Sequence, residues 1–328
     1  MPNLGRNNEF GLAKETTRLA GMTAPAIFLP YTSMEINSMN KYQDSNEAIG
    51  VRHAMTSRDV LNQSVEGKLD GLLNADTIGH FLLYSFGSVT SVQSGTTGAY
   101  THTFTINNNV TLPTFSAFYE RADVGWLRAR GCSVEELDIS AEASGDSKYI
   151  VSFKALQEDN MANQTPVYTD TKARILLGRN CTVKYASSIS GLATGTALDT
   201  KKVSIKSKNN IHVDFALGSQ FGVDVYGKQN EPEASFTAVL KSNVFDTNFK
   251  AGTKMAMSYE WQNVQGISLG SSTLKPLLRF EIAPSIVEVK TNTAINDLVS
   301  MDCTIKPEYS YPDSFAIRAI LQNTTASY

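Results

Sequence analysis

The stretch that most constrains the fold is residues 64–87, where one short helix interrupts a chain made mostly of strands and turns. Alternating Val65, Gly67 and Leu69 predict a strand. An apolar stripe at helical spacing then predicts a helix, with Asn74 or Asp76 as its cap: Ile78, Phe81, Leu82 and Phe86. Gly87 suits the left-handed position after a helix. A lone helix among strands is expected to flank a β-barrel or β-sandwich.

The second half of the chain repeats the pattern of the first. A short helix over Val244–Ala251 precedes Gly252, and alternating apolar strands follow. Four matched pairs stand 165 residues apart: Gly87 and Gly252, Leu112 and Leu277, Phe115 and Phe280, Leu156 and Leu321. We therefore predict a mainly β protein with two tandem domains over residues 26–165 and 166–328, each with one flanking helix. The alternative is a chance alignment of two unrelated β domains.

Two segments lack an apolar pattern of their own. Residues 1–25 resemble an extended arm, and residues 42–62 a long loop or protruding hairpin of the first domain. We expect both to become ordered on contact with another subunit. The candidate inter-subunit contacts are Phe10, Leu12, Leu19, Tyr42, Ile49 and Arg52.

Composition excludes several classes of protein. The 328 residues are 41% hydrophobic and 19% charged, with a net charge of −3, so a folded chain without a basic nucleic-acid-binding surface is predicted. No signal peptide and no apolar run of about 20 residues is present, which predicts a cytoplasmic chain without a membrane span. The three cysteines have no metal-binding spacing and are expected to be buried, reduced thiols.

The sequence contains no pattern typical of catalysis. The four histidines lack an HExxH spacing, and no GxSxG, P-loop or GxGxxG motif occurs. Glu135, Glu136 and Asp138 lie on one expected strand, where a solvated edge is favoured over a carboxylate pair. We predict no catalytic residue, no metal and no cofactor. Two other classes stay open: a carbohydrate- or receptor-binding β protein, and a β-rich hydrolase for which no acid–base pair is found.

Several stretches resemble the phage tail tube, or major tail, protein family of long-tailed siphophages. They are NEFGLAKETT, APAIFLPYTSMEI, SVEGKLDGLL, GAYTHTF, LPTFSAF, GCSVEELDIS, VSFKALQ, IKSKNNIHVDFALGS, EASFTAVL and FKAGTKMAMSYEW. The positions that this resemblance marks as fold signatures are Gly67, Gly87, Phe115, Gly131, Leu137, Gly252 and Phe280.

The resemblance implies a structural virion protein whose neighbouring sheets join into rings, which stack into a hollow tail. Two tube domains per chain imply a trimeric ring with pseudo-sixfold symmetry, a hexamer being the alternative. The implied partners are further copies of the chain and the tape-measure, tail-tip and tail-terminator proteins. DNA would pass during ejection as cargo that does not stick, and assembly would occur in the host cytoplasm. The alternative function is a tail-tip or lectin-like module that binds a receptor or carbohydrate.

Overall fold

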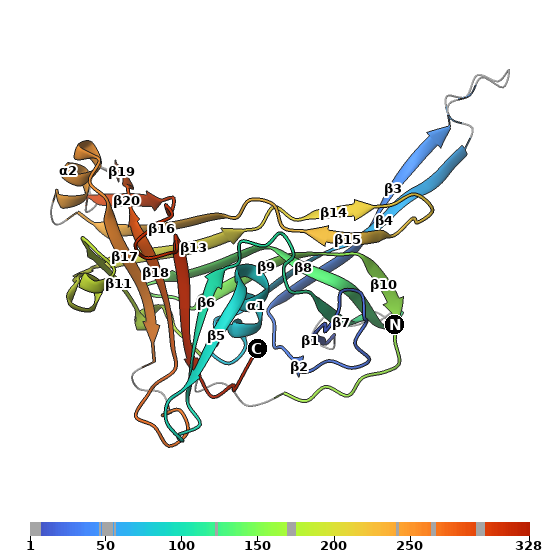
Figure 1. Ribbon diagram of the computed structural model, residues 1–328, viewed down its shortest axis with the longest axis horizontal. Helices are drawn as coiled ribbons and strands as arrows, with labels where there is room; N and C mark the ends of the chain where they lie inside the picture. The colour runs from blue at the N-terminus through green and yellow to red at the C-terminus, as the bar shows by residue number, and fades with distance from the viewer. Residues whose placement is uncertain are drawn as a thin grey trace.

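The computed structural model describes residues 8–45, 47, 55, 57–121, 124–168, 175–240, 243–263, 267–292 and 299–328. Within these residues the protein is mainly β, with antiparallel sheets that stay open and two α-helices, as the sequence predicted (Figure 1). Two short 3-10 helices, Gly178–Asn180 and Ser190–Thr194, lie in the connection between the halves.

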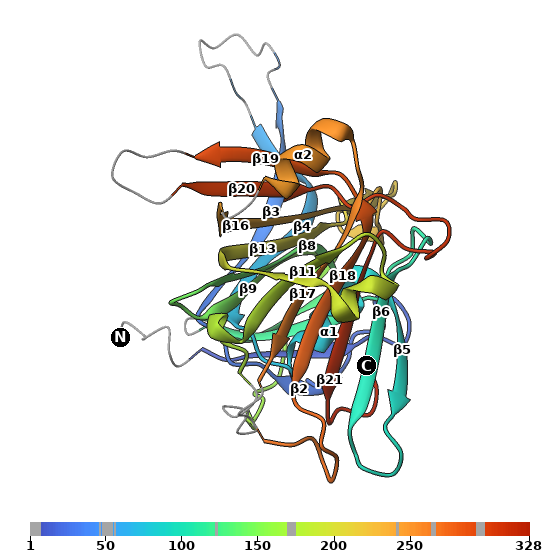
Figure 2. The same ribbon diagram turned by 90° about the vertical axis from the view of Figure 1, so that its left-hand side faces the viewer.

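The larger sheet, here called the main sheet, runs from an edge in the first half of the chain to an edge in the second. Its strands in spatial order are β3 (Ser33–Ser45), β4 (Ser57–Leu72), β9 (Ser147–Ala155), β8 (Gly125–Glu142), β13 (Thr200–Lys208), β16 (Glu231–Val239), β20 (Ser300–Ile305) and β19 (Val287–Asn292). Every neighbouring pair is antiparallel. Figure 2 shows β19, β20, β16 and β13 following one another across the second half.

The N-terminal part of β8 belongs to a side branch of the same sheet. There β8 pairs with β10 (Gln157–Asn160) on one side and β7 (Phe115–Arg121) on the other, and β7 continues to β1 (Phe10–Lys14) and β2 (Ile27–Phe28). Strand β8 runs through both sets of partners as one continuous strand. Gly131 lies inside it with φ +64°, which allows the strand to change partners without breaking.

The second sheet also combines both halves of the chain. Its order is β12 (Thr196–Leu198), β11 (Cys181–Ala186), β17 (Met255–Gln262), β18 (Leu277–Ser285), β21 (Ile317–Asn323), β6 (Tyr100–Ile106) and β5 (Gly87–Gln93). A separate two-stranded hairpin joins β14 (His212–Phe215) to β15 (Gly222–Tyr226). The sequence interval 187–200, expected to be a loop, contains a 3-10 helix and β12.

Helix α1 (Ile78–Phe86) is buried in the core, as its apolar stripe requires. The rings of Phe81 and Tyr149 are 5.5 Å apart, those of Tyr84 and Phe115 4.6 Å, and that of Phe86 lies 6.4 Å from Phe280. The helix therefore contacts strands of both sheets. Its N-cap is Thr77, without a side-chain cap, and not the predicted Asn74 or Asp76. The Asn74 side chain instead accepts a hydrogen bond from the Asp76 backbone at 2.9 Å, just before the helix.

Helix α2 (Val244–Ala251) lies on the second half and buries only Phe245. The Phe245 ring contacts Tyr185 and Phe236, which belong to different sheets. Both helices end as predicted, with Gly87 at φ 86° and Gly252 at φ 65°. One continuous hydrophobic core extends from Phe10 to Leu321, so the two halves share their core as well as their sheets. The predicted division into two tandem domains at residues 165 and 166 stays a prediction.

Candidate assembly interface

The main sheet contains the same four-strand order twice. Reading from the β3 edge, the first unit is β3, β4, β9, β8 and the second is β13, β16, β20, β19. In each unit the first two strands are consecutive strands of the main sheet along the chain, and they precede the helix. The last two strands form a hairpin, and the strand farther from the first two comes first in the sequence. The two units meet where β8 pairs with β13.

Strand pairing aligns the two units residue by residue. Leu69 lies opposite Val151 in the first unit, and Phe236 lies opposite Cys303 in the second. The sequences around Leu69 and Phe236, EGKLDGLL and EASFTAVL, then match in their small and apolar positions. The separation between equivalent residues differs from strand to strand, so the predicted constant spacing of 165 is wrong for the sheet. It holds for the glycines that end the two helices.

Steric contacts explain why glycines occupy the core face of β4, the second strand of the first unit. A Cβ added to Gly67 would lie 2.1 Å from the ring of Phe153, and one added to Gly71 would lie 2.5 Å from the ring of Tyr149. The aromatic side chains of β9 therefore pack directly on the backbone of β4. Alanines 234 and 238 occupy the equivalent places on β16, opposite the smaller Ile305 and Met301.

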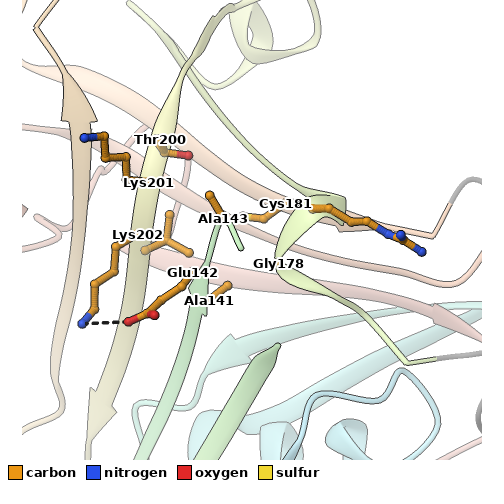
Figure 3. A pocket seen from close by; sticks show the side chains of 10 residues that line it. Ala141, Glu142, Ala143, Gly178, Cys181, Thr200, Lys201 and Lys202 are labelled. Atoms are coloured by element: carbon orange, nitrogen blue, oxygen red, sulfur yellow. Dashed lines mark ion pairs between the residues drawn. The ribbon is translucent and has the colours of Figure 1, made fainter. Parts of the chain in front are cut away.

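The junction between β8 and β13 combines an apolar and a charged face. Ile205 lies opposite Ile139 on the core face. On the other face, Lys206 Nζ lies 3.7 Å from Asp138 Oδ2 and Lys202 Nζ lies 3.4 Å from Glu142 Oε1. The second pair borders a small hollow of about 130 Å³ (Figure 3). Thus Asp138 and Glu136, predicted to form a solvated strand edge, are instead paired with a second strand.

The two ends of the main sheet are edges among the described strands. At one end β3 pairs only with β4, and at the other β19 pairs only with β20. The outer face of β3 carries Glu35 and Asn37, and that of β19 carries Glu288 and Lys290. Unpaired edges of this length are natural sites for adding another strand.

Each unit also begins with a long hairpin. Strands β3 and β4 extend well beyond the rest of the sheet (Figure 1), and Tyr42, Met39, Val60 and Leu61 are exposed on this extension. Of the segment 42–62, expected to be a long loop or protruding hairpin, residues 42–45 and 57–62 belong to β3 and β4, and most residues between them lie outside the described part of the chain. In the second unit the corresponding excursion between β13 and β16 is the β14–β15 hairpin, which lies against the base of β4 through a hydrogen bond from Gln63 N to Gln220 O.

Asn209 and Asn210 do not turn a hairpin, because β13 pairs with β16 rather than with β14. The Asn209 amide instead donates to the backbone carbonyls of Ser85 and Val134 at 2.9 and 3.0 Å. This side chain thereby ties the end of β13 to helix α1 and to β8.

Six of the seven fold-signature positions lie in the interior, whereas Gly252 is exposed. Phe115, Leu137 and Phe280 are core residues, and Gly67 lies beneath Phe153. Gly87 and Gly252 follow the helices, and Gly131 lies against Leu156. They are not gathered into one surface. Leu112, expected to open a strand, precedes β7, whereas Leu277 does open β18.

The candidate inter-subunit contacts divide into three groups. Phe10 and Leu12 are buried in β1, which pairs with β7, so the expectation that the whole arm lacks partners in its own chain is wrong. Leu19 packs against a small cluster that includes Leu156. Tyr42 is exposed, and Ile49 and Arg52 lie outside the described residues.

Several titratable side chains are buried in the described part of the chain, among them Glu15, His102 and Glu281. No cluster of three or more His, Cys, Asp or Glu side chains there is placed to hold a metal ion. The three cysteines are free, and burial raises the pKa of Cys181 and Cys303 to about 12. Cys181 is only half-buried by its exposed area. None of the helices described has the length and apolar content needed to traverse a bilayer.

An open antiparallel sheet built from two like units, with a free edge at each end among the described strands, defines a class of β-sheet subunit suited to edge-to-edge association. The sequence matches the family model described as "Phage tail tube protein" over residues 5–306. The chain therefore belongs to the phage tail tube protein family, and it is a structural component of the virion tail. No curated protein matches the sequence.

Proposed function

We propose that the chain assembles into closed rings by pairing the β19 edge of one copy with the β3 edge of the next. The observation that carries this proposal is the β8–β13 junction, which already joins the last strand of one unit to the first strand of another. Because β3 and β19 run in opposite directions in the alternating sheet, the new contact is antiparallel too. Head-to-tail contacts that close produce a ring, and contacts along the axis stack rings into a tube.

The internal junction also supplies the register of the new contact. By strand pairing, Met34 and Ile36 correspond to Val203 and Ile205, and Leu137 corresponds to Val289. Copying the β8–β13 register then places Asn37 of one copy opposite Lys290 of the next. This pair corresponds to Lys206 and Asp138 inside the chain.

The face of the main sheet opposite the core would line the lumen. On it, charges alternate by strand: β8 carries Glu136, Asp138 and Glu142, β13 carries Lys202, Lys206 and Lys208, and β16 carries Glu231 and Glu233. The basic column of β13 therefore lies between the two acidic columns of β8 and β16. Such a surface offers phosphates no continuous basic track, so DNA would pass through without being retained.

Two units per chain favour a ring of three chains with pseudo-sixfold symmetry over a ring of six chains. The tube would be assembled in the host cytoplasm of a siphophage together with tape-measure, tail-tip and tail-terminator proteins, and DNA would travel through it at ejection. Rotational symmetry of ring images, obtained by electron microscopy, separates three chains from six.

Cysteine cross-linking tests the edge contact. Asn37→Cys combined with Lys290→Cys should give an intermolecular disulfide in assembled material, because directly opposed strand residues are about 4.5–5.5 Å apart. Glu35→Cys with Glu288→Cys, four positions out of register, is the matched control and should give little product. Assembled tubes without the first cross-link would exclude this edge contact, and purified protein that forms no rings at any concentration would contradict the function itself.

A further inference from the structure

The hairpin of the second unit covers an apolar cluster of the first unit. Ile211 and Val225, which flank and form the β14–β15 hairpin, are buried against Leu156 and Leu112. Asp224 of the same hairpin forms an ion pair with Arg18. Leu156 directly follows β9, so the hairpin closes the end of the first unit where β9 stops.

The equivalent place in the second unit carries a half-buried glutamate, paired with Lys254, instead of a buried leucine, and exposed tyrosines follow it. Since Val151 corresponds to Cys303, the residue equivalent to Leu156 is Glu308, and the next position is Tyr309. Tyr309 is 53% exposed and Tyr311 is 88% exposed. Their rings contact each other edge to face, with centroids 5.4 Å apart. Two exposed tyrosines in contact therefore form an aromatic patch near the place where the first unit has a covered aliphatic cluster.

The β3–β4 hairpin carries exposed apolar side chains where it extends beyond the rest of the main sheet (Figure 1). Counting from the equivalent serines Ser38 and Ser207, Tyr42 takes the place of Ile211. Ile211 is buried, whereas Tyr42 is 47% exposed, together with Met39, Val60 and Leu61 on the same extension. Within the described part of one chain, a hairpin covers the end of the first unit only. The exposed side chains of the β3–β4 hairpin and the exposed tyrosines are the corresponding surfaces for a second contact of this kind.

We propose that the Tyr309–Tyr311 patch of one copy receives the β3–β4 hairpin of the next copy in the same ring. The inference rests on the proposed edge pairing, which brings the next copy's β3 beside β19 as β13 lies beside β8. The hairpin would then pass the end of β20 as the β14–β15 hairpin passes the end of β9. The contact would lock neighbouring subunits at a second point, away from the lumen-facing strands.

Two measurements test the proposal. Tyr309→Ser with Tyr311→Ser should raise the concentration needed for ring formation about tenfold or more, as loss of aromatic anchors does at interfaces. Tyr168→Ser, at another exposed tyrosine, is the control and should leave that concentration unchanged. In addition, Tyr42→Cys with Tyr311→Cys should cross-link neighbours in isolated rings, with each single-cysteine variant controlling for the native thiols.

The outcomes separate this inference from the proposed function. Wild-type protein that never forms rings contradicts the edge pairing. Normal ring formation by the double serine variant, together with no cross-link in isolated rings of the Tyr42→Cys and Tyr311→Cys variant, overturns the hairpin contact alone. A cross-link found in stacked tubes but absent from isolated rings would place the hairpin between rings and also overturn it.

Discussion

At Gly67 the absence of a side chain determines how closely two strands approach. The ring of Phe153 occupies the space that a Cβ would need, at 2.1 Å. We expect Gly67→Ala to lower the free energy of unfolding by about 1–3 kcal/mol, because the buried ring must move within a packed core. Gly145→Ala, where the nearest atom is 3.6 Å away, is the matched control. Equal denaturation midpoints for the two variants would contradict this account.

His80 makes the stability of the subunit depend on pH. Burial, and to a lesser extent the nearby Lys14, lower the pKa of His80 from 6.5 to about 4. Its ring contacts Tyr328 at a centroid distance of 4.9 Å, and Lys14 Nζ donates to the Tyr328 carbonyl at 3.0 Å. Protonation would therefore place a second cation beside Lys14 in this contact.

The sign of the effect follows from proton binding. As the pH falls below 6.5, His80 becomes protonated in the unfolded chain, whereas in the folded chain it stays neutral until about pH 4. The free energy of unfolding therefore decreases as the pH falls through this window. The loss between pH 6.5 and 5 should be about 2 kcal/mol. Denaturant unfolding of His80→Gln should show a flatter pH dependence than wild type, with His212→Gln at an exposed histidine as control. Parallel curves for wild type and His80→Gln would refute the assignment.

Among the elements, β1 gives the N-terminal segment a role in the subunit itself. Phe10 and Leu12 are buried, and Glu15, just after the strand, accepts hydrogen bonds from Thr114, Ser116 and the Gly131 backbone. Deleting residues 1–23 would remove all of these contacts and uncover the edge of β7.

We therefore expect that deletion to lower the thermal unfolding midpoint clearly, since burial of Phe10 alone is worth about 3–5 kcal/mol. Deleting only residues 1–7 keeps β1 and is the control. If the longer deletion unfolds at the wild-type temperature but fails to form tubes, the segment acts in assembly alone, as the sequence had suggested.

For the whole molecule, local patterns predicted elements better than their partners. Helix α1, its Gly87 stop and the alternation of β17 are visible in the sequence because large apolar side chains recur there at helix or strand spacing. The junction between β8 and β13 is not, because pairing depends on contacts between distant residues such as Ile139 and Ile205. The burial of Phe10 depends in the same way on β7. For the assembly interface, the sequence singled out Tyr42 but not Tyr309, whose exposure only the fold reveals.

The opposite directions of the two free edges have a consequence for growth. Copies joined through β19 and β3 all share one orientation, so every long hairpin in a ring would leave from the same side. The two faces of the ring would then be chemically different, so a stack of such rings would have two different ends. Elongation and its termination would thus be confined to one end of the tube. Strand direction alone would make the head end of the tube different from the tip end.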